Sequence, residues 1–192
     1  MKLAYFVHDL GDPAVWRRVD MLRSGGASVT LLGFARGAIP QRPGEPPAIC
    51  LGRTQNARML QRSLAVLRAG LRSDAWREAV AGADVIMARQ LESLALAALA
   101  QRRFAPGARL VFECLDVHRL MLSRGAVGRG LRWIEGALLA RSDRLVVSSP
   151  AFVEAYFAKA HPVLPPIQLV ENRVLASEIH MPAPAAERPA GR

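Results

Sequence analysis

Short apolar runs alternate with helical patterns along almost the whole chain, and this alternation restricts the possible folds more than any other feature. Seven runs are predicted to be β-strands because most of their residues are apolar: 3–7, 28–34, 48–51, 84–88, 108–114, 144–149 and 167–172. Continuous apolar character is typical of parallel strands buried on both faces, whereas strands with one solvent face alternate apolar and polar residues. The sequence therefore predicts a parallel sheet with helices on both sides.

Helical patterns lie between most of these strands. We expect helices at residues 12–23, 55–72, 74–81, 91–103, 130–141 and 150–159, with the glycine-rich stretch 125–130 as a flexible turn before the fifth of them. Pro13 suits the first turn of its helix and Ser149 suits an N-cap. Because crossovers between parallel strands are right-handed, this order predicts an open, doubly wound, mostly parallel α/β fold of the Rossmann-like type, with three α/β/α layers.

The chain has 192 residues, of which 51% are apolar, so it is not an intrinsically disordered protein and it has ample material for a core. We expect one domain at residues 1–175, followed at 176–192 by a Pro/Ala-rich linker or tail that leads toward a further domain. Cys50 and Cys114 lie far apart and lack metal-ligand spacing. No apolar run reaches the roughly 18 residues of a membrane span, so we expect a cytoplasmic location, with peripheral membrane attachment as an option.

The formal net charge of +10 points to an anionic partner. Nucleic acid is disfavoured, because each half of the chain has 13 basic and 8 acidic residues, a net +5, and only 6% of residues are aromatic. Residues 55–72 concentrate the charge instead. On a helical wheel one arc of roughly 120° holds Arg58, Arg62, Arg68 and Arg72. An arc of roughly 60° holds Leu60, Leu64, Leu67 and Leu71, which we expect to face the sheet. The arginine face predicts contact with acidic lipid head groups, and an ordinary solvated face is an equally open interpretation.

In open α/β sheets, ligands bind beyond the carboxyl ends of the strands. Ten residues expected at that rim are site candidates: His8, Asp9, Gly11, Arg89, Asp116, His118, Ser148, Ser149, Glu171 and Asn172; Gln90 follows Arg89 at the same rim without an assigned role. Asp116 and His118 are two residues apart, so their side chains point the same way in an extended loop. An aspartate can orient an imidazole for hydrogen bonding or proton transfer. We therefore predict catalytic roles for these two residues and substrate binding for the others.

Several other interpretations of these residues stay open or are excluded. His8 and Asp9 are equally suited to capping the helix that follows, and Ser149 suits a cap alone. A metal site is not expected, because one histidine and one aspartate have no clustered third ligand. The turn HDLGDP after the first strand is not GxGxxG, and the sequence holds neither a P-loop nor GxSxG. Nicotinamide, P-loop ATPase and serine-hydrolase chemistry are therefore disfavoured.

Five rim segments, taken in their order and spacing, resemble a known family. They are MKLAYFVHDLGDP with the helix and strand after it, DVIMARQLESLALA, LVFECLDVHRL, RLVVSSPAFVEAYF and LVENRV. Over about residues 1–175 the chain resembles the amino-terminal domain of bacterial glycosyltransferases with the two-Rossmann-domain (GT-B) architecture. The type is the group-1/family-4 transferases of exopolysaccharide assembly, including succinoglycan-type enzymes.

In that family the amino-terminal domain holds the acceptor, and the carboxyl-terminal domain holds most of the nucleotide-sugar donor. The resemblance implies transfer with retention of configuration, without a metal or other cofactor. By position, it implies that the turn from His8 to Gly11 approaches the donor phosphates or the acceptor, and that His118 contacts the reacting sugar. It also implies that Ser149 lines the cleft and that Asn172 opens the interdomain crossover. The chain departs from the pattern in having a single glycine in the first turn and an arginine after Asn172.

The donor-binding domain of this family has no counterpart in the 192 residues. The expectation is thus the acceptor-binding half of a retaining glycosyltransferase that serves surface polysaccharide synthesis and is inactive alone. Its expected partners are a nucleotide sugar, a saccharide or lipid-linked acceptor, the missing carboxyl-terminal domain and anionic inner-membrane lipid. The alternative is a non-catalytic Rossmann-like module that binds a phosphorylated ligand or a partner protein. Reading the gene beyond residue 192 discriminates between the two.

Overall fold

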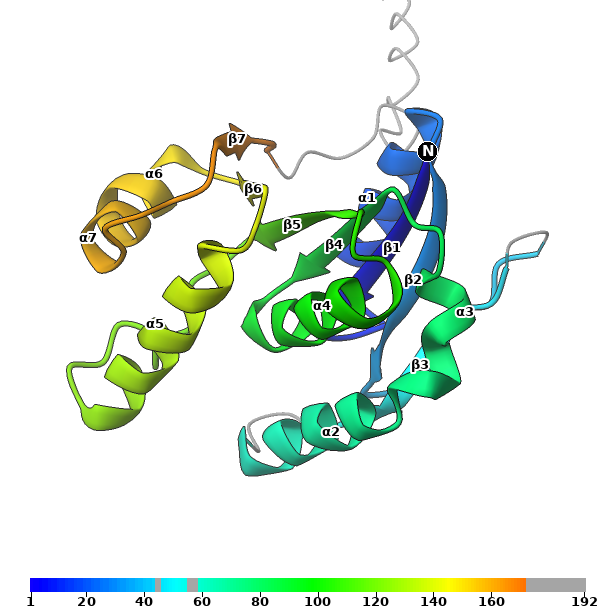
Figure 1. Cartoon of the computed structure of the whole chain (residues 1–192), viewed down its shortest axis with the longest axis horizontal. Helices are drawn as coiled ribbons and strands as arrows, with labels where there is room; N and C mark the ends of the chain where they lie inside the picture. The colour runs from blue at the N-terminus through cyan, green and yellow to red at the C-terminus, as the bar shows by residue number, and fades with distance from the viewer. Residues whose placement is uncertain (44–45, 55–58, 172–192) are drawn as a thin grey trace, which may run out of the picture.

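The computed structural model describes residues 1–43, 46–54 and 59–171, and for residues 59–64 it describes the backbone alone. The expected linker at 176–192 and Asn172 lie outside these ranges. Seven parallel strands form one sheet in the order β3-β2-β1-β4-β5-β6-β7 (Figure 1). The strands are β1 (Lys2–Val7), β2 (Ser28–Ala35), β3 (Ile49–Arg53), β4 (Val85–Arg89), β5 (Arg109–Cys114), β6 (Arg144–Val147) and β7 (Ile167–Leu169).

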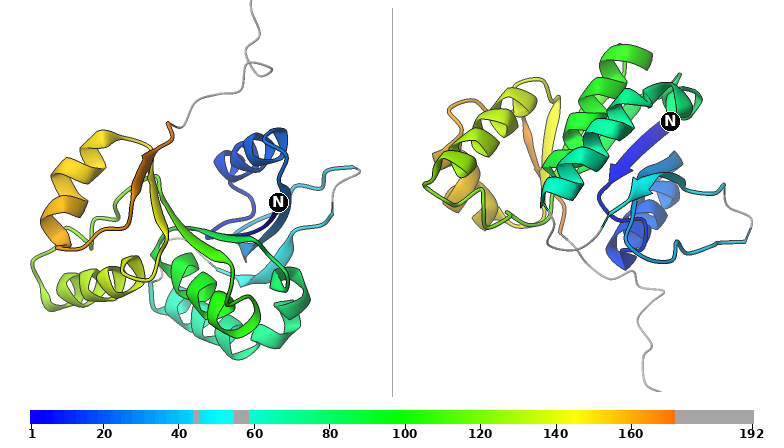
Figure 2. Two further views of the ribbon diagram at one scale, coloured as in Figure 1. Left: turned by 45° about the horizontal axis from the view of Figure 1, so that its top comes forward. Right: turned by 90° about the horizontal axis from the view of Figure 1, so that it is seen from below.

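Helices connect these strands and cover both faces of the sheet (Figure 2). They are α1 (Pro13–Ser24), α2 (Met59–Leu71), α3 (Arg77–Val80), α4 (Leu91–Phe104), α5 (Ala126–Leu139), α6 (Pro150–Phe152) and α7 (Ala158–Ala160). A 3-10 turn at Ser73–Trp76 precedes α3, and a π-helical turn at Val153–Phe157 joins α6 to α7. The predicted three-layer, doubly wound α/β fold is confirmed.

Two buried apolar clusters form the two sides of the core. Between the sheet and α1, the side chains of Tyr5, Val7, Val15, Trp16 and Val19 pack together. The larger cluster lies between the sheet and α2 to α7 and includes Phe6, Leu94, Phe112, Leu139 and Phe157. Successive residues of β1 enter opposite clusters, which explains why this strand is apolar at every position.

The chain winds outward from the centre of the sheet in both directions. It starts at β1, runs to the β3 edge, crosses back to β4 and then continues to β7. β1 and β4 are therefore neighbours whose connections leave on opposite sides, and this reversal opens a crevice at their carboxyl ends. The turn after β1 and the turn after β4 flank that crevice.

Helix α5 begins earlier than the sequence predicts. The stretch 125–130 is not a flexible turn, because the helix already starts at Ala126. Gly128 is buried against the loop before the helix, where a Cβ atom would stand 2.2 Å from the carbonyl oxygen of Ser123 and 2.7 Å from that of Leu120. The glycine is thus required by a close approach between helix and loop, not by a turn.

The predicted orientation of helix α2 is wrong where its side chains are described. Leu67 and Leu71 are 59% and 76% exposed, whereas Ala69 is 4% exposed. Beside Ala69, Gly70 approaches α4 so closely that a Cβ atom would stand 3.3 Å from a methyl of Leu99. Small residues face α4 because its leucines already fill the space between the two helices.

Candidate functional site

The turn after β1 is closed by its own aspartates. Asp9 Oδ1 accepts the Gly11 N–H at 3.0 Å, and Asp12 Oδ1 accepts the Ala14 N–H at 2.9 Å as the N-cap of α1. Arg36 Nε lies 3.6 Å from Asp9 Oδ2. Asp9 therefore shapes the turn, and Gly11 lets the turn pass close to the carbonyl of Ala38. Because Asp12 is the N-cap of α1, the interpretation of His8 and Asp9 as caps of this helix is wrong.

His8 points inward from this turn. Its Nδ1 is buried and has no hydrogen-bond partner among the described residues. Burial, followed by the nearby Arg36 guanidinium, lowers the pKa of His8 from 6.5 to about 4. The imidazole is therefore neutral at physiological pH, and its Nδ1 is an orphaned polar atom beside the switch point.

Arg89, predicted as a rim residue, lies inside the sheet. Its Nε donates to Glu113 Oε2 at 2.8 Å, while Arg18 of α1 donates its Nε to Glu113 Oε1 at 2.6 Å. The Tyr5 hydroxyl donates to the same carboxylate. Burial and the neighbouring Glu113 raise the pKa of Tyr5 well above its ordinary value, so the hydroxyl keeps its proton. Two guanidiniums and a phenol around one carboxylate form a structural clamp between α1, β1, β4 and β5.

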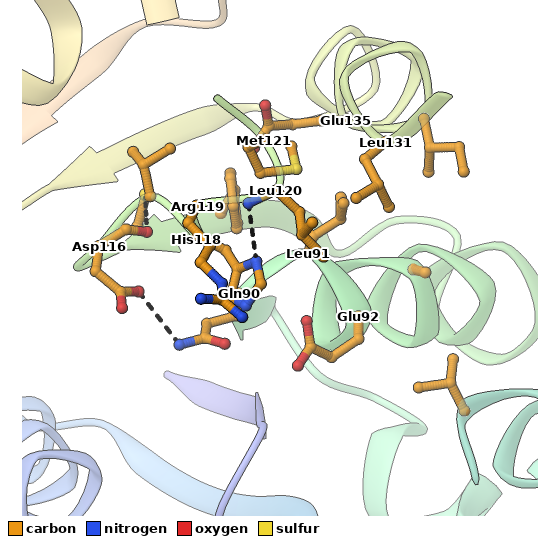
Figure 3. Close-up of a pocket in the computed structure, with 16 residues that line it drawn as sticks. Gln90, Leu91, Glu92, Asp116, His118, Arg119, Leu120, Met121, Leu131 and Glu135 are labelled. Atoms are coloured by element: carbon orange, nitrogen blue, oxygen red, sulfur yellow. Dashed lines mark hydrogen bonds between the residues drawn. The ribbon is translucent and has the colours of Figure 1, made fainter. Parts of the chain in front are cut away.

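A cavity of about 380 Å³ opens beside the carboxyl ends of β4 and β5 (Figure 3). It lies among the start of α4, the segment 116–121 and one side of α5, with Val66 of α2 at its edge. Its apolar wall includes Leu91, Phe112, Val117, Leu120, Met121 and Leu131. The polar side chains that it contains come from Gln90, Glu92, Asp116, His118, Arg119 and Glu135. An apolar wall with a few polar groups is typical of a small-molecule site.

Asp116 and His118 both line this cavity. The backbone, rather than Asp116, orients the imidazole, because His118 Nδ1 accepts the Leu120 N–H at 3.3 Å. A neutral imidazole held in this way carries its proton on Nε2 and can donate it to a ligand. Asp116 instead accepts an amide proton from Gln90 Nε2 at 3.3 Å (Figure 3). The pair thus presents one donor and one acceptor, each oriented separately.

Gln90 reaches Asp116 from a strained backbone position. Its φ of 70° is the single positive value among the described non-glycine residues. Gln90 precedes α4, and its side chain makes no capping bond to that helix. Such conformations persist where the surrounding structure enforces them and are frequent at functional sites. From this position the amide reaches Asp116, and both residues line the cavity.

Glu135 of α5 lines the cavity and is held by two buried partners. Its Oε2 accepts the Tyr156 hydroxyl proton at 2.5 Å, and His161 Nε2 lies 2.7 Å from the same oxygen. All three residues are buried. Burial and Glu135 also raise the pKa of the neighbouring Cys114 to about 12, so this lining thiol stays protonated and is no nucleophile.

The remaining predicted rim residues lie outside the cavity lining. Ser149 accepts the Ala151 N–H at 3.3 Å as the N-cap of α6, which agrees with its capping interpretation, and Ser148 Oγ donates to the Leu115 carbonyl at 3.3 Å. Glu171 is exposed after β7. Among the predicted membrane contacts, Arg68 and Arg72 are exposed, whereas Arg58 and the side chain of Arg62 lie outside the described residues.

Within residues 1–43, 46–54 and 59–171, no three His, Cys, Asp or Glu side chains gather as metal ligands would. Over the same ranges, every helix is too short or too polar to cross a bilayer.

Sequence reasoning missed two groups that organise the site, Glu113 and Glu135, and it placed Gln90 at the rim without its strained backbone. Glu113 is a charged residue near the carboxyl end of an apolar strand, and Glu135 is the one acid in residues 117–142. An isolated acid in such surroundings signals a buried, paired carboxylate. The sequence does not predict the positive φ of Gln90, because glycine is the residue that usually adopts such a conformation.

The chain is similar to known proteins over most of its length. Residues 12–172 match the glycosyl transferase 4-like domain. Over 177 residues the chain is 45% identical to the succinoglycan biosynthesis protein ExoL of Rhizobium meliloti (strain 1021), which covers 91% of this chain and 44% of that protein. The chain therefore spans less than half the length of this relative.

Solved structures share the fold at low sequence identity. Sucrose-phosphate synthase from Thermosynechococcus elongatus matches with a TM-score of 0.61 and 16% identity, over 89% of this chain and 48% of that one. The lipopolysaccharide outer core galactosyltransferase WaaB matches with a TM-score of 0.55 and 14% identity, over 99% of this chain and 51% of that one. At this identity the likeness establishes the architecture alone.

Proposed function

Because the chain belongs to the glycosyl transferase 4-like family, we propose that it is the acceptor-binding half of a retaining glycosyltransferase. The transferred sugar comes from a nucleotide-sugar donor, and the acceptor is a saccharide or a lipid-linked saccharide of surface polysaccharide synthesis. The biosynthetic role of the 45% identical relative supports the pathway class. The cavity bounded by Asp116 and His118 is the observation that carries the acceptor assignment.

The cavity matches the chemistry of a sugar. Pyranose rings have apolar faces that pack on aliphatic and aromatic walls, and hydroxyl groups that need both donors and acceptors. Here the Nε2–H of His118 supplies a donor and the carboxylate of Asp116 supplies an acceptor. An acceptor hydroxyl that binds Asp116 gains electron density at its oxygen, while His118 holds the ring in place. No resident cofactor or metal enters this scheme.

The donor is proposed to approach from the switch point. The turn from His8 to Gly11 borders the crevice between β1 and β4, beside the orphaned Nδ1 of His8. Most contacts to the nucleotide are assigned to residues beyond this chain. The 192 residues alone are therefore proposed to bind acceptor and to transfer no sugar.

Calorimetric titration tests the acceptor assignment. The probes are glucose linked through a diphosphate to a short isoprenoid in detergent micelles, the same isoprenoid diphosphate without sugar, and free glucose. We expect the complete probe to bind best, and Asp116→Asn or His118→Ala to weaken it. Equal affinity of both variants and the unmodified chain for all three probes would overturn the assignment. Turnover of a nucleotide sugar above background by the purified chain would overturn the proposed inactivity.

The chain is further proposed to act at the cytoplasmic face of the inner membrane, with α2 as one contact. Arg68 and Arg72 are exposed, and the unexpectedly exposed Leu67 and Leu71 lie beside them. Arginines beside exposed leucines are more typical of a helix that contacts anionic lipid than of a helix face that contacts only water. Flotation with anionic and neutral vesicles tests this contact, and Arg68→Glu with Arg72→Glu is expected to lower recovery with anionic vesicles.

A further inference from the structure

Helix α5 turns an apolar face to solvent. Val127, Trp133 and Ile134 are 61%, 76% and 41% exposed, and Leu122 in the loop before the helix is 60% exposed. At 100° per residue the three helix positions fall within an arc of about 120°. The opposite side of α5 carries the buried Gly128, Glu135 and Leu139. A helix that only covers a sheet has one apolar face toward the core and a polar face toward solvent. Helix α5 has apolar residues on its solvent face as well.

Arginines border this face. Arg119, Arg124 and Arg129 are exposed, and we call these three, together with Leu122, Val127, Trp133 and Ile134, the α5 surface. The single acid in residues 117–142 is Glu135, which is buried and bonded to Tyr156. The α5 surface thus combines exposed apolar side chains with positive charge and no exposed carboxylate.

Exposed apolar side chains bordered by arginines favour an anionic lipid bilayer as the partner of the α5 surface. Tryptophan favours the boundary between head groups and acyl chains, and each arginine near an anionic leaflet adds attraction. A second copy of the chain fits poorly, because a two-fold contact through this surface would bring the same arginines together without acidic partners. Helix α5 also lies at the periphery of the described elements, where a flat surface can reach it (Figure 1).

The α5 surface adjoins the cavity. Arg119 and Ile134 belong to the surface and also line the cavity. Helix α4 contacts both α2 and α5, and all three helices lie on the same side of the sheet (Figure 2). A saccharide could occupy the cavity while its lipid stays in the bilayer.

From these observations we propose that the α5 surface docks the protein on an anionic membrane and presents the cavity to lipid-linked acceptors. The second clause rests on the proposed function, whereas docking through the α5 surface depends neither on the α2 contact nor on sugar transfer. Vesicle binding requires neither donor nor acceptor, so a failure of docking and a failure of sugar transfer can be told apart.

The three tryptophans of the chain make the test direct. Trp16 and Trp76 are 6% and 4% exposed, whereas Trp133 is 76% exposed. Emission that responds to vesicles and to acrylamide therefore reports on Trp133. With vesicles of phosphatidylglycerol and phosphatidylcholine we expect a shift to shorter wavelength and protection from acrylamide, and with phosphatidylcholine alone at least about tenfold weaker binding.

Variants separate docking from general charge effects. Arg124→Glu with Arg129→Glu is expected to weaken binding to anionic vesicles at least about tenfold, and Trp133→Ala, measured by co-sedimentation, about tenfold. The control Arg102→Glu with Arg109→Glu makes the same charge change at exposed sites near the amino ends of the strands. We expect it to change the affinity for anionic vesicles less than about threefold.

Three results would overturn the proposal: an unchanged Trp133 emission with anionic vesicles, equal binding to neutral vesicles, or equal losses in the two double variants. A wavelength shift that follows protein concentration without vesicles, together with a dimer in light scattering, would replace the bilayer with a second copy of the chain.

Discussion

Arg89 Nε lies 2.8 Å from Glu113 Oε2, and the two residues are direct neighbours across β4 and β5. Arg18 reaches the other carboxylate oxygen from α1. One carboxylate thus ties a helix to two strands immediately below the rim. Because Gln90 follows Arg89 and lies next to the cavity, this clamp fixes the backbone from which the site is built.

Removing the charge of Glu113 is expected to be severe. Glu113→Gln removes the carboxylate that Arg18 and Arg89 share and leaves Arg89 with Asp12, whose Oδ2 lies 3.8 Å from Arg89 Nη1. Loss of one member of a buried pair costs about 3–5 kcal/mol of unfolding free energy. Urea denaturation measures the loss. The control is Asp74→Asn, which breaks the exposed pair with Arg77 and is expected to cost less than about 1 kcal/mol. Similar losses in both variants would mean that the clamp adds no stability.

His8 predicts a pH dependence of stability. Its pKa is about 4 in the folded chain against 6.5 ordinarily, so between these values the unfolded state binds a proton that the folded state does not. Stability therefore falls as the pH drops from 6.5 toward 4, by about 2–3 kcal/mol at pH 4.5. His8→Gln removes this contribution, and its unfolding free energy should change less over that range. Parallel curves for the variant and the unmodified chain would contradict the burial of a neutral imidazole.

The fold could be predicted from the sequence because a parallel sheet covered on both faces demands strands that are apolar at every position. The orientation of α2 could not. Its leucines form the more apolar face, but the space is set by α4, whose Leu96 and Leu99 approach Gly70. Which face of a helix packs depends on the volume its partner leaves, and that information lies in another part of the chain.

The site was predicted in part. The rule that ligands bind beyond carboxyl strand ends identified Asp116 and His118, which both line the cavity. The same rule included Arg89, which turns inward because it pairs with Glu113 on the neighbouring strand β5. A pairing between residues 24 positions apart has no local signature. Position along a strand therefore predicts nearness to the rim better than it predicts the direction of a long side chain.

Two glycines of α5 provide a matched pair of substitutions. Gly128→Ala places a methyl 2.2 Å from the Ser123 carbonyl oxygen, so the loop at 120–123 must move, and we expect a loss of about 1–3 kcal/mol. Gly130→Ala meets nothing within 4 Å and should gain about 0.5–1 kcal/mol from higher helix propensity. Thermal unfolding measures both. A gain in both variants would show that the loop does not pack on α5.

The displaced loop also bears on binding. Leu120 and Met121 line the cavity, so Gly128→Ala should weaken the micellar acceptor probe while Gly130→Ala leaves its affinity unchanged. Calorimetry under conditions where both variants are folded separates this effect from unfolding. Equal affinities would remove the loop from the acceptor site.

The last prediction concerns the donor at His118 Nε2. His118→Ala deletes it, and loss of one hydrogen bond of about 1–1.5 kcal/mol weakens the glucosyl isoprenoid probe about tenfold. His118→Gln restores an N–H donor on a side chain of similar reach, so its affinity should return to within about threefold. Arg109→Gln, exposed at the amino end of β5, serves as the control. If alanine and glutamine weaken the probe equally, the ring of His118 acts by packing and the proposed hydrogen bond is wrong.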